Sequence, residues 1–149
     1  LRSPNQQMKV AFILAIIVAI IATVSAVAVD FTNCATGTPV IALKGFDASY
    51  WPPQKDKEFV MTTTGVASKQ ITGGEWSVVS TWAGMTVDKQ TGAFENWGDV
   101  SLPLAAGDVT IKNVGTLPSS APAGSYTMTT KASTQSGEEI FCYKMTFQL

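Results

Sequence analysis

The stretch that decides the fold is the C-terminal sequence EIFCYKMTFQ, residues 139–148. From position 141 onward every second residue is large and apolar, namely Phe141, Tyr143, Met145 and Phe147. The positions between them carry Lys144, Thr146 and Gln148, which suit a face turned toward water. Because successive side chains of a β-strand point to opposite sides, this alternation predicts a strand with one buried face.

The chain upstream repeats this organisation in short runs rich in Val, Ile, Thr and aromatic residues. Clusters of Gly, Pro, Asn and Asp bound these runs, and no window has a sustained helical period. The runs predict strands over residues 39–47, 58–66, 75–83, 108–114 and 125–133, besides 139–148. Residues 88–92, Asp-Lys-Gln-Thr-Gly, have the composition of a turn. The pattern is typical of a single all-β domain.

About seven strands in one small domain favour an immunoglobulin-like antiparallel β-sandwich of two sheets, with an up-and-down barrel as the main alternative. Periodicity also predicts which side chains face inward. The candidate interior residues are Phe59, Met61, Val78, Trp82, Tyr126, Met128, Tyr143, Met145 and Phe147. Taken alone, these stripes favour a solid core, because an apolar stripe needs no ligand to explain it.

The first 28 residues are interpreted as upstream residues followed by a secretory signal peptide. Met8-Lys9 gives a positive start, residues 10–22 form an apolar run, and small residues stand at Ala26 and Ala28. We expect cleavage after Ala28, with Ala26 as the second candidate, and a domain over residues 29–149. An uncleaved membrane anchor is the alternative, because residues 10–29 approach the length that crosses a bilayer. Cleavage would deliver the protein outside the cell or into the endosomal or lysosomal lumen.

The composition of the domain excludes several classes of function. From residue 29 onward, eight lysines and eleven carboxylates leave a net charge of −3. Without a basic patch, binding to nucleic acid has no support. The chain has no histidine, which removes Ser-His-Asp and Cys-His catalysis and His-ligated zinc. The scattered loop carboxylates have no spacing that suggests a catalytic pair. We therefore expect a monomer that is not an enzyme and needs no metal or cofactor.

The two cysteines, Cys34 and Cys142, stand near opposite ends of the domain. In an exported protein a single pair of this kind predicts a disulfide. Cys142 falls on the outward face of its predicted strand, together with Ile140. The bridge could therefore run along the sheet edge or through a bulge.

Both ends of the domain resemble the ML lipid-recognition family, which includes the soluble sterol carriers of Niemann–Pick type C and the phosphatidylglycerol/phosphatidylinositol transfer proteins. The resemblance rests on Asp30-Phe31-Thr32-Asn33-Cys34, on Pro122-Ala123-Gly124-Ser125-Tyr126, and on Gly137 followed by Ile140-Phe141-Cys142. Many members have six cysteines. This chain keeps only the first-to-last pair, and its segment 94–99 has no cysteine where a central pair often lies.

The resemblance implies that the nine interior residues line a cavity for a sterol or phospholipid. It also implies transient contact with a membrane or a membrane protein during transfer. Trp51 and Trp97, beside turn residues, could pack at the rim or contact a membrane surface. The alternative function is a secreted immunoglobulin-like recognition or adhesion module with a solid core, acting through loops 51–57 or 94–99.

Overall fold

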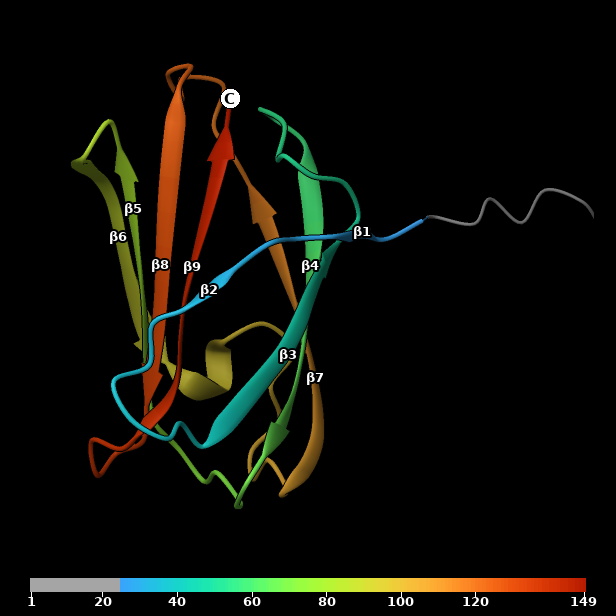
Figure 1. Cartoon of the computed structure of the whole chain (residues 1–149), viewed down its shortest axis with the longest axis vertical. Coiled ribbons are helices and arrows are strands. Elements are labelled where there is room, and N and C mark those ends of the chain that lie inside the picture. The colour runs from blue at the N-terminus through green and yellow to red at the C-terminus, as the bar shows by residue number, and fades with distance from the viewer. Residues whose placement is uncertain (1–24) are drawn as a thin grey trace, which may run out of the picture.

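The computed structural model describes residues 25–149 and consists of two antiparallel β-sheets that face each other (Figure 1). The first sheet has the strand order β1 (Val27–Ala28), β3 (Ile41–Ala48), β4 (Glu58–Ala67), β7 (Gly107–Thr116). The second has the order β2 (Thr32–Asn33), β9 (Glu139–Gln148), β8 (Ser125–Ser133), β5 (Glu75–Trp82), β6 (Met85–Ala93). The expected signal peptide lies almost entirely outside the described residues. Within them, no helix is long and apolar enough to cross a membrane.

The predicted all-β sandwich is confirmed. Strands β8 and β9 have the predicted bounds, and β3, β4, β5 and β7 differ from theirs by at most two residues at an end. The structure has nine strands instead of about seven, because β1 and β2 contribute two residues each. Such short pairings leave no periodic signal in the sequence, since a period of two needs several residues to become visible.

The predicted turn at residues 88–92 is wrong, because these residues lie inside β6. This strand forms the edge of the five-stranded sheet, and nearly all its side chains are exposed. An edge strand without a buried face can be polar throughout, so its sequence is that of a loop. The chain turns earlier, at Ala83 and Gly84, whose φ angles are 48° and 81°. Two consecutive positive φ angles are typical of the tight turn of a β-hairpin.

The expectation that Ile140 faces outward is also wrong, since Ile140 is fully buried in the apolar core. The register between β8 and β9 skips one residue here: Ala132 pairs with Phe141, and Ser133 pairs with Glu139. Ile140 is the extra residue of a β-bulge, which changes the alternation locally. Ile140 and Phe141 therefore both contribute to the same core.

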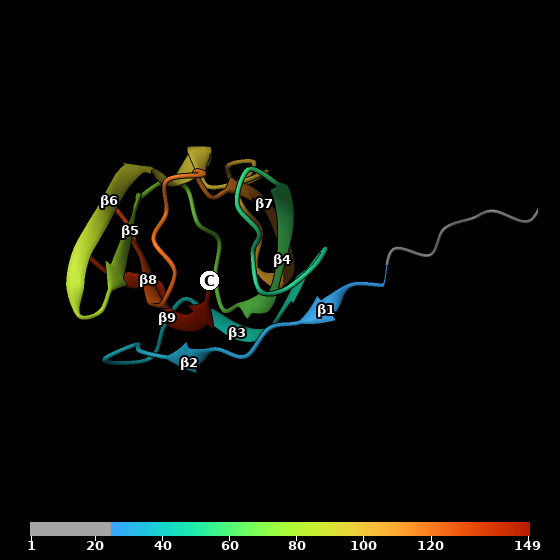
Figure 2. The ribbon, with the colours of Figure 1, turned by 90° about the horizontal axis from the view of Figure 1, so that it is seen from above.

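The N-terminal segment crosses from one sheet to the other along one edge of the sandwich (Figure 2). Strand β1 pairs with β3, and β2 pairs with β9. The register of β2 with β9 brings Cys34 opposite Cys142. Their sulfur atoms form a disulfide, and the Cys34 N–H donates to the Cys142 carbonyl at 3.0 Å. The predicted bridge is confirmed, and it runs along the sheet edge.

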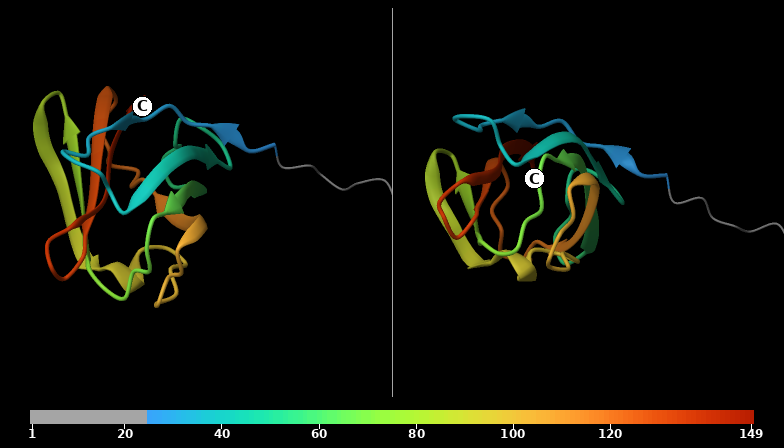
Figure 3. Two further views of the ribbon diagram at one scale, coloured as in Figure 1. Left: turned by 60° about the horizontal axis from the view of Figure 1, so that its bottom comes forward. Right: turned by 90° about the horizontal axis from the view of Figure 1, so that it is seen from below.

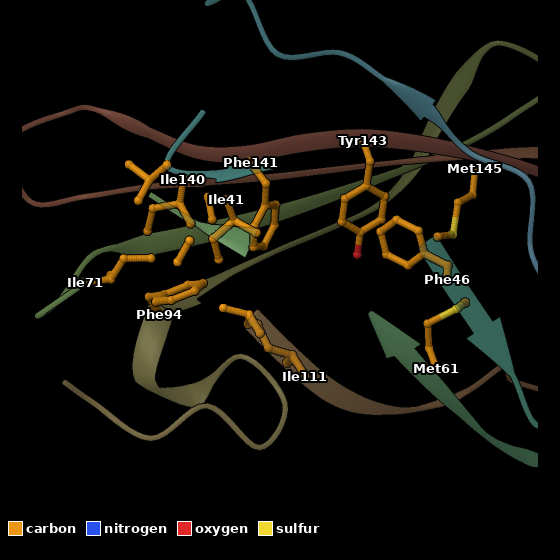
Figure 4. Packing of buried hydrophobic residues seen from close by; sticks show 14 of the residues in the cluster. Ile41, Phe46, Met61, Ile71, Phe94, Ile111, Ile140, Phe141, Tyr143 and Met145 are labelled. Atoms are coloured by element: carbon orange, nitrogen blue, oxygen red, sulfur yellow. The ribbon is translucent and has the colours of Figure 1, made fainter. Parts of the chain in front are cut away.

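A dense apolar cluster runs between the sheets from Ile71 and Phe94, at the end that we call the closed end, to Met61 and Met145 (Figure 4). The 3₁₀ helix η1 (Phe94–Asn96) lies at the edge of the sandwich between β6 and β7, opposite the N-terminal segment, as the view from below shows (Figure 3). Phe94 is fully buried, and its ring centroid lies 6.0 Å from that of Phe141. Large buried residues of both sheets surround it, namely Ile41, Ile71, Ile140 and Phe141.

Removal of the disulfide by Cys34→Ala with Cys142→Ala should lower the free energy of unfolding by about 2–5 kcal/mol. The reason is that the bond spans 108 residues, and closing a long loop restricts the unfolded chain. Urea unfolding measures the difference. A loss below about 1 kcal/mol would contradict this role for the bond.

Phe94→Ala should cost about 3–5 kcal/mol of stability, because it leaves a cavity among fully buried neighbours. Val87→Ala is the matched control: Val87 is 49% exposed on β6, and its loss should change stability by no more than about 0.5 kcal/mol. Equal effects of the two changes would show that η1 does not hold the closed end together.

Candidate functional site

The inner face of the five-stranded sheet consists of rows of side chains that the strand register aligns. The row farthest from the closed end joins Trp82, Tyr126 and Phe147. The following rows are Ser80–Met128–Met145, Val78–Thr130–Tyr143 and Trp76–Ala132–Phe141. We call the end at the first row the mouth. It is the end at which β5, β7 and β9 finish and β4 and β8 begin (Figure 1).

All nine predicted interior residues lie at inward positions of the strand alternation, but the structure divides them into two groups. Met61, Tyr143 and Met145 belong to the contiguous apolar cluster, and Phe59 and Met128 pack against it. The other four, Val78, Trp82, Tyr126 and Phe147, lie outside that cluster. Val78 and Tyr126 are nonetheless buried, at 9% and 6% exposure. The apolar cluster therefore reaches the mouth through Phe59 and Trp51, and the inward residues outside it all lie on the five-stranded sheet.

Two loops hold the aromatic row at the mouth. Trp82 Nε1 donates a hydrogen bond to the Ala123 carbonyl at 3.1 Å, and the Tyr126 hydroxyl donates to the Pro122 carbonyl at 2.8 Å. The rings of Tyr126 and Phe147 are stacked, with centroids 5.4 Å apart. Trp51, from the loop before β4, meets Phe147 edge-on at 5.3 Å. The mouth thus presents a preformed aromatic rim.

Halfway down the sandwich, Phe46 of β3 meets Tyr143 of β9, with ring centroids 4.4 Å apart. Figure 4 shows the Tyr143 hydroxyl pointing into the space between the sheets. Thr130, beside Tyr143, and Thr63, beside Phe46, are both buried at inward positions. The sequence interpretation did not include these two threonines. The alternation of Phe59-Met61-Thr63 and of Tyr126-Met128-Thr130 already indicated that they face inward.

Burial raises the pKa of the Tyr143 phenol well above its ordinary value near 10. The neighbouring Thr130 hydroxyl lowers this pKa in part, although no hydrogen bond of normal geometry joins the two groups. The phenol therefore stays neutral at any physiological pH. It offers the interior a hydrogen-bonding group without a charge.

The space between the sheets is electrically neutral. The inward positions of β4, β5, β8 and β9 carry no Asp, Glu, Lys or Arg. Within residues 25–149, no group of three or more His, Cys, Asp and Glu side chains is placed to hold a metal ion. Such an interior can exclude water from an apolar molecule and offer it a few neutral hydrogen-bonding groups.

Trp97, one of the two tryptophans whose role was open, packs at the closed end. Its ring lies 5.0 Å from that of Trp76 and 6.3 Å from that of Phe141. Trp51 lies at the mouth and packs on Phe147. Of the two, only Trp51 is close to a place where a molecule could enter between the sheets.

A separate concavity lies on the outer face of the five-stranded sheet, near the closed end. Polar and charged residues line it, among them Glu75, Lys131 and Glu139. Glu139 also accepts a hydrogen bond from the Thr36 backbone N–H at 3.1 Å. None of the nine predicted interior residues borders this concavity, so it is distinct from the space between the sheets.

Comparison with known proteins identifies the family. Residues 28–149 match the sequence profile of the ML domain. This match covers most of the chain, and it includes both sheets and all nine interior residues. The chain belongs to the ML domain family.

A curated relative supports the assignment, and so does a solved structure. The chain is 29% identical over 119 residues to the phosphatidylglycerol/phosphatidylinositol transfer protein of Aspergillus oryzae, covering 77% of this chain and 67% of that protein. A crystal structure of a Niemann-Pick type C2 protein from the Japanese carpenter ant superposes with a TM-score of 0.63 at 15% identity. That superposition covers 80% of this chain and 98% of the other. Chicken MD-1 complexed with lipid IVa aligns over the same shares at 14% identity, with a TM-score of 0.47.

The raised pKa of Tyr143 predicts a loss of stability at alkaline pH. Above pH 10 the unfolded chain releases the phenolic proton while the folded protein keeps it, so stability falls as pH rises. This residue should contribute a slope of about 1.4 kcal/mol per pH unit. Urea unfolding at pH 9 to 11 should give a shallower slope for Tyr143→Phe than for the wild type.

Proposed function

We propose that this protein binds a lipid, a sterol or a phospholipid, between its two sheets and transfers or presents it, without catalysing a reaction. Membership of the ML domain family and the similarity to a phosphatidylglycerol/phosphatidylinositol transfer protein support lipid as the ligand class. The single observation that carries the position of the site is that four inward side chains of the five-stranded sheet lie outside the contiguous apolar cluster, namely Val78, Trp82, Tyr126 and Phe147.

The physical argument for this site is the burial of apolar surface. Removing apolar surface from water is worth about 25 cal/mol per Å². Val78, Met128 and Phe147 face inward from the five-stranded sheet but lie outside or at the side of the contiguous cluster. An acyl chain or sterol skeleton among them would bury its own surface together with theirs. Flexible methionine side chains such as Met128 suit a site that adapts to its ligand.

Transient membrane contact follows from the place of the mouth. Met85 and Val87, at the start of β6, are 58% and 49% exposed. They belong to the hairpin between β5 and β6, beside Trp82. Exposed apolar residues at the rim can enter the interfacial layer of a bilayer while a lipid passes. A domain with a net charge of −3 is not strongly attracted to anionic lipid, so the apolar rim would provide the contact.

We also propose that the protein acts as a monomer outside the cell or in the endosomal or lysosomal lumen. The Cys34–Cys142 disulfide fits an oxidising compartment. The signal peptide interpretation supports export, with the mature chain beginning at Val29. Val29 is 5% exposed, and its N–H donates to the Phe46 carbonyl at 2.8 Å. The first residue after the expected cleavage would therefore be held in the fold.

Native mass spectrometry of the protein made in a eukaryotic secretory host tests the proposed ligand class. We expect a bound lipid, or uptake of one from vesicles of phosphatidylcholine with phosphatidylglycerol and cholesterol. Met128→Trp should reduce uptake at least tenfold, because the larger ring fills inward space near the mouth. Thr129→Trp, at the adjacent outward position of β8, is the matched control and should leave uptake unchanged. Wild-type protein that takes up no lipid would favour a recognition module with a solid core.

Membrane contact has a separate test, the rate of lipid transfer between donor and acceptor vesicles. Met85→Asp with Val87→Asp should slow transfer several-fold while the amount of lipid bound at equilibrium stays the same. Thr91→Asp, on the same strand but nearer the closed end, should change neither quantity. Unchanged transfer by the double variant would contradict docking through this hairpin.

A further inference from the structure

Four buried polar side-chain atoms have no hydrogen-bond partner within the described part of the chain. They are Thr63 Oγ1, Thr130 Oγ1, Asn113 Nδ2 and Trp76 Nε1, of which the last belongs to the row nearest the closed end. Thr63 is 4% exposed and Thr130 is 0% exposed. A buried polar group without a partner costs free energy, so native proteins contain few of them. Two such hydroxyls in one apolar interior point to a partner that comes from outside the chain.

The strand registers place the two hydroxyls at the same depth on opposite sheets. Thr130 of β8 lies between Val78 and Tyr143 in its row. Thr63 of β4 lies in its own row between Phe46 and Ile111. The two rows face each other, because the rings of Phe46 and Tyr143 meet across the sandwich. β4 and β8 are inner strands of their sheets, so the two threonines face the middle of the interior.

The depth of this level limits what can reach it. Thr130 lies four residues along β8 from Tyr126 in the mouth row. At about 3.3 Å per residue, this separation is about 13 Å. Asn113 of β7 pairs with Met61 of β4, and it therefore lies one row nearer the mouth than Thr63. A ligand that satisfies these atoms must therefore carry a polar atom past the aromatic rim and deep between the sheets.

We propose that the ligand carries a neutral hydrogen-bonding oxygen in its buried part, and that the hydroxyls of Thr63 and Thr130 bind this oxygen. The inference rests on the proposed function and specifies the chemistry of its ligand. A lipid whose buried part is pure hydrocarbon would leave both hydroxyls unpaired. A charged headgroup does not fit either, since no charged side chain occupies the inward positions around them. The Tyr143 phenol beside Thr130 adds a third neutral group at the same level.

Two sources of such an oxygen are the hydroxyl of a sterol and the ester carbonyl of an uncharged diacylglycerol. A threonine hydroxyl can donate to either, and it can also accept from a sterol hydroxyl. The test uses two matched pairs of probes in detergent-free binding assays. One pair is cholesterol and 5-cholestene, which lacks the hydroxyl. The other pair is a diacylglycerol and its dialkyl ether, which lacks the ester carbonyls.

The wild type should bind the oxygen-bearing member of one pair about tenfold more tightly than its partner, and that pair identifies the source. Thr63→Val and Thr130→Val should each remove most of this ratio while keeping or improving affinity for the oxygen-free probe. Thr63→Ser and Thr130→Ser keep a hydroxyl and should keep the ratio, which guards against a purely steric effect. Thr129→Val, on the outward face of β8, is the control and should behave as the wild type.

The outcomes separate this inference from the proposed function. Equal affinities for both members of each pair, with binding intact, would overturn the inference and leave lipid binding standing. The inference also fails if both valine variants keep the wild-type affinity ratio, because groups other than these hydroxyls then bind the oxygen. Failure of all four probes to bind would contradict both the inference and the proposed function.

Discussion

The contact between Phe46 and Tyr143, with ring centroids 4.4 Å apart, joins the two sheets along one edge of the sandwich. Phe31 extends this contact, its ring meeting Phe46 at 4.8 Å. The N-terminal segment passes over the same edge: the Val29 N–H donates to the Phe46 carbonyl of β3, β2 pairs with β9, and the Cys34–Cys142 disulfide fixes the segment to β9. The opposite edge has no direct pairing of β6 with β7. The sheets are thus joined at one edge and at the closed end.

This arrangement divides stability and binding between two halves of one small domain. The closed end has fully buried residues from both sheets, and dense packing of this kind supplies most of the folding free energy. Near the mouth, Trp82, Tyr126 and Phe147 are held by hydrogen bonds to loop carbonyls and by ring stacking instead of by the core. A site between the sheets can therefore tolerate unpaired hydroxyls, because the packed residues of the closed end keep the fold intact.

The sequence predicted the sandwich, the strand bounds of β8 and β9, and the disulfide, because each leaves a local pattern of alternation or residue type. It did not predict β6 or the bulge at Ile140. An edge strand exposed on both faces has no apolar period. A bulge changes the side to which one residue points, and no residue type in the sequence marks its position. The nine interior residues were found by their apolar character. Thr63 and Thr130 were missed because a search for apolar stripes passes over polar residues, even where the alternation places them inward.

The family assignment, the inward side chains outside the apolar cluster and the neutral interior lead to one account, in which lipid occupies the space between the sheets. Methionine-methyl NMR tests this position most directly. Met61, Met128 and Met145 face the interior, whereas Met85 is 58% exposed outside. With a short-chain phosphatidylglycerol that stays monomeric, the account predicts chemical-shift changes and lipid contacts at the interior methyl groups, strongest at Met128, and none at Met85. Contacts at Met85 alone, or saturable binding that leaves the interior methionines unchanged, would contradict it.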